Sequence, residues 1–324
     1  MLGRRGCWPL LAVALLALAA LGWLVAGWFT AGPLKQETAF VVPDGASLSS
    51  VATKLEADGT ISSAEAFRIR ARIFGAGAPI KAGEFMFPKG ASPSRILSII
   101  QGDEVLRRFV TIPEGMPSIM VYERLLANSQ LTGSIEVPPE GSILPDTYEI
   151  ERGEGRQAVL LRMQAAMQRT VAELWAKRSS RTAVATPEAA LSLAAIVEKE
   201  TGKPSERRTV AGLYSNRLRQ GIMLQADPTI IYPITKGKPL GRRIRQSEIQ
   251  AVNDYNTYSM VGLPKGPITN PGRASIEAVL NPAQTDVLYM VADGTGGHLF
   301  AKTLPEHNAN VERWFAIRRA RGDF

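Results

Sequence analysis

The sequence predicts an α+β protein with one N-terminal membrane-spanning helix, and three observations lead to this prediction. Residues 8–29 carry no charge and are long enough, at about 1.5 Å per residue, to cross about 30 Å of hydrocarbon. Beyond them, segments with helical spacing of apolar residues alternate with short strand-like segments. The chain has 324 residues, and a domain commonly takes about 150. We therefore expect a single transmembrane helix followed by two folded α+β units.

Composition excludes several classes of protein. Hydrophobic residues make up 45% of the chain and charged residues 21%, so wholesale disorder is not expected. The formal charge is +8, but the basic residues are scattered and form no stripe with aromatic residues. Such diffuse charge suits an anionic lipid or wall polymer and does not indicate nucleic acid. With one cysteine, Cys7, and two histidines, His298 and His307, we expect no metal and no cofactor.

The first apolar segment is expected to anchor the chain. Arg4 and Arg5 precede it, which places the N-terminus in the cytoplasm. Tryptophans lie near both ends of the segment, where amphipathic rings prefer the interface: Trp8, Trp23 and Trp28. The alternative is a signal peptide cleaved near Leu16–Ala20, but the apolar run is longer than the 7–15 residues typical of such peptides. The rest of the chain is then periplasmic or extracytoplasmic, on a single-pass anchor in the plasma (inner) membrane.

After a linker at residues 31–37, residues 38–104 are expected to form the first unit. A strand at Phe40–Val42 is followed by a helix capped by Ser47 and a second helix from Ser63 to Phe74. Gly83–Phe87 has the pattern of a returning strand, and Ser92 opens a further helix. This order and the sequence PDGASLSSVATKL resemble a LysM-like subdomain. The resemblance implies glycan binding, with a spacer that only orients the next unit as the alternative.

The second unit is expected to cover residues 105–324. A strand at Val110–Ile112 precedes a capped helix that begins near Ser118. Residues 130–150 are rich in Pro, Gly and Ser and predict a long loop, and apolar spacing predicts a helix over residues 154–178.

A helix that ends in two glutamates carries the chemistry. Thr186 and Pro187 form a helix start, and Gly202 and Pro204 form a stop after Thr201. At 100° per residue, Glu200 extends an apolar stripe and Glu198 lies on the opposite side; the stripe consists of Leu193, Ile196 and Val197. A poorly hydrated carboxyl has a raised pKa and can act as a general acid. Periodicity alone leaves open that Glu200 reaches solvent or pairs with Arg207.

Longer motifs indicate a family. Residues 193–232 read LAAIVEKETGKPSERRTVAGLYSNRLRQGIMLQADPTIIY, and five shorter motifs follow: Tyr255-Asn256-Thr257-Tyr258, Gly262-Leu263-Pro264 with Pro267-Ile268, Asn270-Pro271-Gly272, Ala274-Ser275-Ile276, and Leu288 to His298. From about Glu37 onward the chain resembles the MltG (YceG-like) family of endolytic murein transglycosylases.

The resemblance implies a catalytic residue and a reaction. The family's glutamate matches the second Glu of the EKET run, which is Glu200, with Glu198 as the runner-up. Thr201 supplies the small hydroxyl residue that follows the acid in other lytic transglycosylases. The implied reaction cleaves the β-1,4 bond between N-acetylmuramic acid and N-acetylglucosamine without water and leaves 1,6-anhydromuramyl ends. The implied substrate is nascent peptidoglycan at the membrane, whose elongation the cleavage limits, and peptidoglycan synthases are candidate partners.

Further polar residues are candidates for binding aminosugars. Glu198 lies two residues before Glu200, and Thr201 directly follows it. Five more candidates lie in predicted loops, which commonly line clefts: Gln225, Asp227, Tyr232, Asn256 and Tyr258. The alternatives are that Asp227 caps the turn at Pro228 and that Asn256 stabilises its own loop.

Two other functions remain open at this point. A lysozyme-like muramidase would use Asp227 or Glu198 as a second carboxylate and would leave reducing ends. A non-catalytic scaffold would bind the wall through the first unit and recruit synthesis enzymes.

Overall fold

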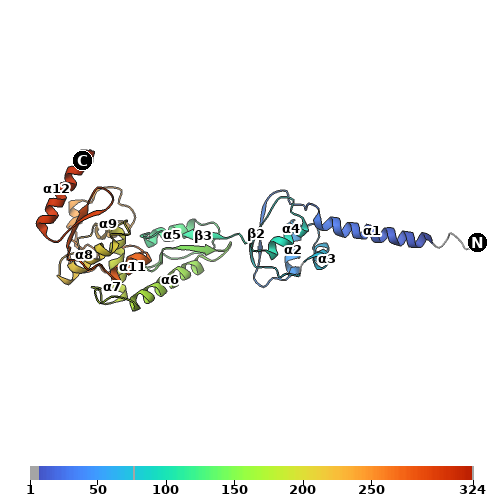
Figure 1. The fold of residues 1–324 in the computed structure, drawn as a ribbon, viewed down its shortest axis with the longest axis horizontal. Coiled ribbons are helices and arrows are strands. Elements are labelled where there is room, and N and C mark those ends of the chain that lie inside the picture. Colours follow the sequence, from blue (N-terminus) through green and yellow to red (C-terminus); the bar gives the residue numbers. More distant parts are fainter. Residues whose placement is uncertain (1–6, 76, 323–324) are drawn as a thin grey trace, which may run out of the picture. The chain divides into compact units, whose positions relative to one another are not determined.

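The computed structural model describes residues 7–75 and 77–322, and the chain divides into two compact units (Figure 1). Unit 1 ends at Arg108 and unit 2 starts at Phe109, where the sequence predicted a boundary near residue 105. Among the described residues, helices are combined with three two-stranded sheets, so the predicted α+β class is confirmed.

Helix α1 (Cys7–Phe29) is the predicted apolar helix. Its segment Leu11–Phe29 is long and apolar enough to cross a membrane, and a signal sequence has the same properties. Most of its side chains are exposed, but Trp28 is only 3% exposed because it packs into unit 1, with its ring 5.8 Å from that of Phe67. Arg4 and Arg5, on which the orientation was predicted, lie outside the described residues, as does the side chain of Trp8.

Unit 1 has the predicted order of elements. Strands β1 (Thr38–Val42) and β2 (Gly83–Phe87) pair antiparallel, with Phe40 opposite Phe85. Three helices complete the unit: α2 (Leu48–Ala57), α3 (Ala64–Phe74) and α4 (Pro93–Gln101). Each begins where a serine side chain accepts a hydrogen bond from the backbone three residues later, as the sequence predicted; the serines are Ser47, Ser63 and Ser92.

The first part of unit 2 differs from the prediction in two respects. The predicted loop contains strand β4 (Thr147–Ile150), which pairs with β3 (Arg108–Thr111). The surrounding Pro and Gly residues hid this short strand, which depends on a distant partner. Helix α5 (Ser118–Ala127) has no local side-chain cap; instead the carboxylate of Glu140 accepts a 2.8 Å bond from Ser118 N. The predicted long helix is α6 (Arg156–Ala176).

The rest of unit 2 surrounds helix α7 (Pro187–Glu200), which starts at its predicted cap, Thr186. Its residues 192–197 are all buried, so the helix is enclosed on every side and not along one stripe. Helices α8 (Arg207–Arg219) and α11 (Arg273–Leu280) pack against it. The remaining elements are α9 (Asp227–Thr235), α10 (Gln246–Ile249), the antiparallel hairpin of β5 (Tyr289–Ala292) and β6 (His298–Ala301), and α12 (Leu304–Arg321), which lies against that hairpin.

Candidate active site

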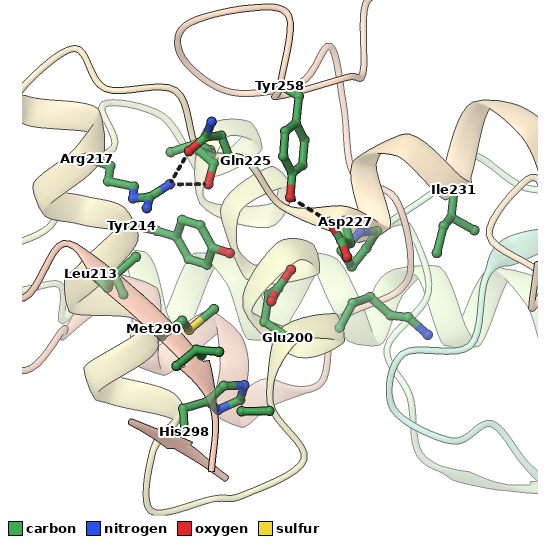
Figure 2. Close-up of a pocket in the computed structure, with 15 residues that line it drawn as sticks. Glu200, Leu213, Tyr214, Arg217, Gln225, Asp227, Ile231, Tyr258, Met290 and His298 are labelled. Atoms are coloured by element: carbon green, nitrogen blue, oxygen red, sulfur yellow. Dashed lines mark hydrogen bonds between the residues drawn. The ribbon is translucent and has the colours of Figure 1, made fainter. Parts of the chain in front are cut away.

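Glu200 is the last residue of α7 and points into a pocket of about 360 Å³ (Figure 2). Four elements and two loops form the walls: the end of α7, α8, the start of α9 with the loop before it, the loop that carries Tyr258, and the β5–β6 hairpin. The polar ends of Tyr214 and Asp227 are directed toward the Glu200 carboxyl in this view. A buried helix end thus presents one carboxyl group to an open cavity.

The environment of Glu200 favours the protonated carboxyl. Its Oε1 is buried and has no hydrogen-bond partner among the described residues. Burial, followed by the negative charge of Asp227, raises the pKa of Glu200 to about 8; a hydrogen bond with Tyr214 and the positive charge of Arg217 only partly oppose this. At neutral pH the group therefore holds a proton that it can donate to a leaving group.

Helix α8 supplies Tyr214 and Arg217 to the pocket. Tyr214 is 2% exposed, and Arg217 is also buried. The Arg217 guanidinium donates hydrogen bonds to three carbonyl oxygens, those of Leu288 (2.7 Å), Leu224 (2.9 Å) and Met223 (3.1 Å). The sequence interpretation did not select these residues as part of the site. Their spacing contained a signal, because Val210, Tyr214 and Arg217 follow one another at i, i+4 and i+7 on one helix face.

Asp227 is held in place by Tyr258. Asp227 opens α9, and its Oδ1 accepts a 2.6 Å hydrogen bond from the Tyr258 hydroxyl. Burial and this bond raise the pKa of Tyr258, so its hydroxyl stays a donor. Helix α9 has no side-chain cap, so the capping alternative for Asp227 does not describe its contacts. Both predicted residues line the pocket with Glu200.

Gln225 also lines the pocket, and its backbone has a conformation that few residues other than glycine adopt. Its φ is 52°, in the left-handed region, which costs a non-glycine residue about 1 kcal/mol. The backbone is held there by a 3.1 Å bond from Gln225 N to Thr257 O, while Oε1 accepts a 3.3 Å bond from Arg217 Nη1. Strained residues tend to cluster at functional sites, so this geometry supports a role for the loop before α9.

Glu198 and Thr201 lie outside this pocket. The Glu198 side chain is 6% exposed; its Oε2 accepts a 2.9 Å bond from Gly272 N, and Oε1 lies 3.8 Å from Arg207. Arg207, the alternative partner considered for Glu200, thus pairs with Glu198. Thr201 is buried, and its hydroxyl accepts a 3.1 Å bond from Lys203 N. Both residues hold the end of α7 against its surroundings.

Asn256 and Tyr232 are also outside the pocket lining. Asn256 is fully buried; its Nδ2 donates to Ala251 O at 2.6 Å and Ile249 O at 2.9 Å, and its Oδ1 accepts from Tyr258 N at 3.0 Å. These are the contacts expected of a residue that stabilises its own loop. The ring of Tyr232 packs 4.8 Å from that of Tyr255.

A second cavity of about 470 Å³ lies next to this pocket, and the two share Lys199, Pro228 and Ile231 as lining residues. At the other side of the first pocket lies His298, whose Nδ1 is 2.8 Å from Glu206 Oε2.

Comparison with known proteins finds a matching family, two relatives with similar sequences and a solved structure with a similar fold. The sequence model of the YceG-like family matches residues 40–313. The chain is 26% identical to the endolytic murein transglycosylase of Bacillus subtilis over 86% of its own length and 84% of the relative's. It is 28% identical to that of Streptococcus pneumoniae over 83% of its length, and spans 57% of that relative. A crystal structure of a yceG-like protein from Listeria monocytogenes is similar at a TM-score of 0.55 and 25% identity, covering 85% of this chain and 99% of that one.

Proposed function

Because the chain belongs to the YceG-like family, we propose that it is a lytic transglycosylase that cleaves peptidoglycan glycan strands, with Glu200 as its acid and base. The observation that carries the proposal is the buried carboxyl of Glu200, whose pKa is raised to about 8 in an open pocket. The relatives named endolytic murein transglycosylases, at 26% and 28% identity, support the substrate and the reaction class.

The proposed reaction needs only one catalytic carboxyl group. The protonated Glu200 donates its proton to the glycosidic oxygen as the bond from C1 of N-acetylmuramic acid to O4 of N-acetylglucosamine breaks. The resulting carboxylate then takes the proton of the muramyl C6 hydroxyl as that oxygen bonds to C1. Glu200 thus regains the proton that it donated, no water is consumed, and the product ends in a 1,6-anhydro ring. An intramolecular nucleophile is already in place, which lowers the barrier by proximity.

The second candidate is a muramidase, and one observation favours it. Asp227 places a second carboxylate in the same pocket, and a two-carboxylate glycosidase can use such a group to activate water or as a nucleophile. This enzyme would leave reducing ends in place of anhydro ends. The product therefore separates the two candidates.

The test uses purified glycan strands and mass spectrometry of the products. We expect 1,6-anhydromuramyl ends from the wild-type protein and a loss of about 10²–10⁴-fold in rate for Glu200→Gln, since Gln is nearly isosteric but cannot donate the proton. Circular dichroism checks that the variant is folded. Reducing ends from the wild type would establish the muramidase, and wild-type rates from Glu200→Gln would exclude this residue as the acid.

The location of the reaction is a separate proposal. We place α1 across the plasma membrane, with the N-terminus in the cytoplasm and unit 2 outside, on the basis of the apolar segment Leu11–Phe29 and the basic residues before it. N-terminal sequencing of the membrane-bound protein tests this, and a mature chain that starts near residue 21 would contradict it. Cleavage at the membrane would limit the growth of strands as synthases release them.

Residues 38–104 of unit 1 are proposed to form a LysM-like subdomain that holds glycan for unit 2. The strand, helix, helix, strand order of β1, α2, α3 and β2 supports this. If a truncated chain that starts near residue 105 folds and cleaves polymeric glycan at the full rate, the unit is a spacer.

A further inference from the structure

Helix α3 of unit 1 lies directly beside the last turns of α1. The guanidinium carbon of Arg70 is 4.3 Å from the centre of the Trp23 ring, and Nη2 donates a 3.2 Å bond to Trp23 O. A Cβ at Gly27 would lie 2.1 Å from Arg70 Nη2, so a side chain at position 27 would displace the guanidinium from this place. Trp23 is six residues before the end of α1 at Phe29, which corresponds to about 9 Å along the axis. The contact therefore lies well inside the apolar segment.

The face of α3 that reaches toward α1 is also its apolar exposed face. Ala66, Ile69, Arg70 and Ile73 follow one another at i, i+3, i+4 and i+7, and so form one stripe along the helix. Ile69 is 42% exposed and Ile73 is 55% exposed. Between Thr30 and Arg108, no other large hydrophobic side chain that the structure describes is exposed. The stripe thus combines an unusual apolar surface with the arginine that contacts the candidate span.

A cavity of about 290 Å³ lies at the same junction. Its lining includes Trp23, Thr30, Ser62, Ser63 and Arg70. Arg70 is only 8% exposed, yet its Nε has no hydrogen-bond partner among the described residues. An arginine with a free donor beside hydroxyl groups is a suitable receptor for a phosphate oxygen.

We propose that this stripe of α3 is seated in the outer interface of the bilayer, with Ile69 and Ile73 at the boundary between headgroups and acyl chains and Arg70 binding a lipid phosphate. The inference rests on the proposed membrane anchoring of α1. Trp23 carries an amphipathic ring of the kind that prefers the membrane interface, so its contact with Arg70 places that guanidinium at the level of the headgroups. Interfacial helices bury their apolar face about 5–10 Å into the boundary between headgroups and acyl chains, a depth that Ile69 and Ile73 of the stripe would reach. Unit 1 would then be fixed against the membrane by two elements, α1 and α3.

Depth-dependent fluorescence quenching in vesicles tests this proposal on the full chain. With Cys7→Ser as background, an environment-sensitive dye is attached to one new cysteine at a time: Ile73→Cys on the stripe, Leu16→Cys inside the span, and Asp103→Cys as the matched control. The Asp103 side chain is 96% exposed and follows the C-terminal end of α4, whose first residue, Pro93, lines the same cavity as Trp23. The vesicles contain phosphatidylglycerol and lipids that carry a nitroxide either near the headgroup or deep in the acyl chain.

We expect the dye at position 73 to be quenched most by the shallow nitroxide, several-fold more than at position 103, and the dye at position 16 most by the deep one. Quenching at position 73 should decrease when phosphate-free glycolipids replace the phospholipids. If the dye at position 16 is quenched while the dyes at positions 73 and 103 are both only weakly quenched, α1 spans the membrane but α3 does not lie in the interface. If the dye at position 16 is not quenched, neither the membrane-spanning role of α1 nor the interfacial position of α3 holds. Strong and equal quenching at positions 73 and 103 shows unspecific adsorption, which also overturns the proposal.

Discussion

The hydroxyl of Tyr258 donates a 2.6 Å hydrogen bond to Oδ1 of Asp227, and both residues line the pocket that contains Glu200 (Figure 2). The bond fixes a negative charge near the proposed acid. That charge is the second-largest cause, after burial, of the raised pKa of Glu200. Tyr258 thus holds in place the carboxylate whose charge helps to set the pH range in which Glu200 can act.

We predict that Asp227→Asn moves the upper pH limit of activity downward. Glu200 acts as an acid only while protonated, and its pKa of about 8 places this limit on the basic side of neutrality. Removing the Asp227 charge lowers the pKa of Glu200, so activity is lost from a lower pH. The measurement is kcat/KM for glycan cleavage as a function of pH.

Tyr258→Phe is the matched control for this variant. It removes the hydrogen bond but leaves the Asp227 charge, so its upper pH limit should stay closer to that of the wild type even where its rate is reduced. Identical limits in the wild type and Asp227→Asn would show that the charge has no influence on Glu200.

Glu198 should matter for stability and not for chemistry. Its Oε2 accepts the bond from Gly272 N at the start of α11. Glu198→Gln keeps an acceptor oxygen and should retain appreciable activity, whereas Glu198→Leu leaves Gly272 N unpaired and should cost about 1–3 kcal/mol. Thermal unfolding and product analysis of both variants measure this. Loss of cleavage in a fully folded Glu198→Gln would instead make Glu198 the acid.

Local rules in the sequence predicted most of the helices. The caps at Ser47, Ser63 and Thr186 depend on residues three positions apart, and the structure contains all three. Strand β4 and the start of α5 were missed because each depends on a distant partner: β3 for the strand and Glu140 for Ser118 N. Sequence spacing does not reveal such contacts.

The site could be predicted only in part for the same reason. Periodicity and family resemblance selected Glu200, and loop position selected Gln225, Asp227 and Tyr258, which line the same pocket. The same loop argument selected Asn256, but the amide of its side chain donates its hydrogen bonds to carbonyl oxygens of its own loop. Which face of a loop residue meets the cavity is decided by tertiary packing. The roles of all these residues in the reaction stay predictions.

Asn270 is predicted to be a structural hub of unit 2. It is fully buried; Nδ2 donates to Met116 O at 2.9 Å and Ser118 Oγ at 3.0 Å, and Oδ1 accepts from Ile143 N at 3.0 Å. Asn270→Ala leaves these groups unpaired and should cost about 3 kcal/mol, or about 6–12 °C in Tm for a unit of this size. Asn308→Ala, at an exposed position of α12, is the control and should unfold like the wild type. Equal Tm values for the two variants would contradict the prediction.

The raised pKa of Glu200 also predicts how stability depends on pH. The native protein keeps this proton up to about pH 8, whereas the unfolded chain releases it near the ordinary value of 4.5. Between these values the native state binds more protons, so Glu200 makes the free energy of unfolding fall as pH rises, by at most about 1.4 kcal/mol per pH unit. Glu200→Gln lacks this effect and should gain stability relative to the wild type from pH 5 to pH 8. Glu140, whose pKa burial raises to about 7, is present in both proteins and cancels in the difference. Urea unfolding of both proteins at several pH values measures that difference, and a constant difference would show that Glu200 is ionised in the native state at neutral pH.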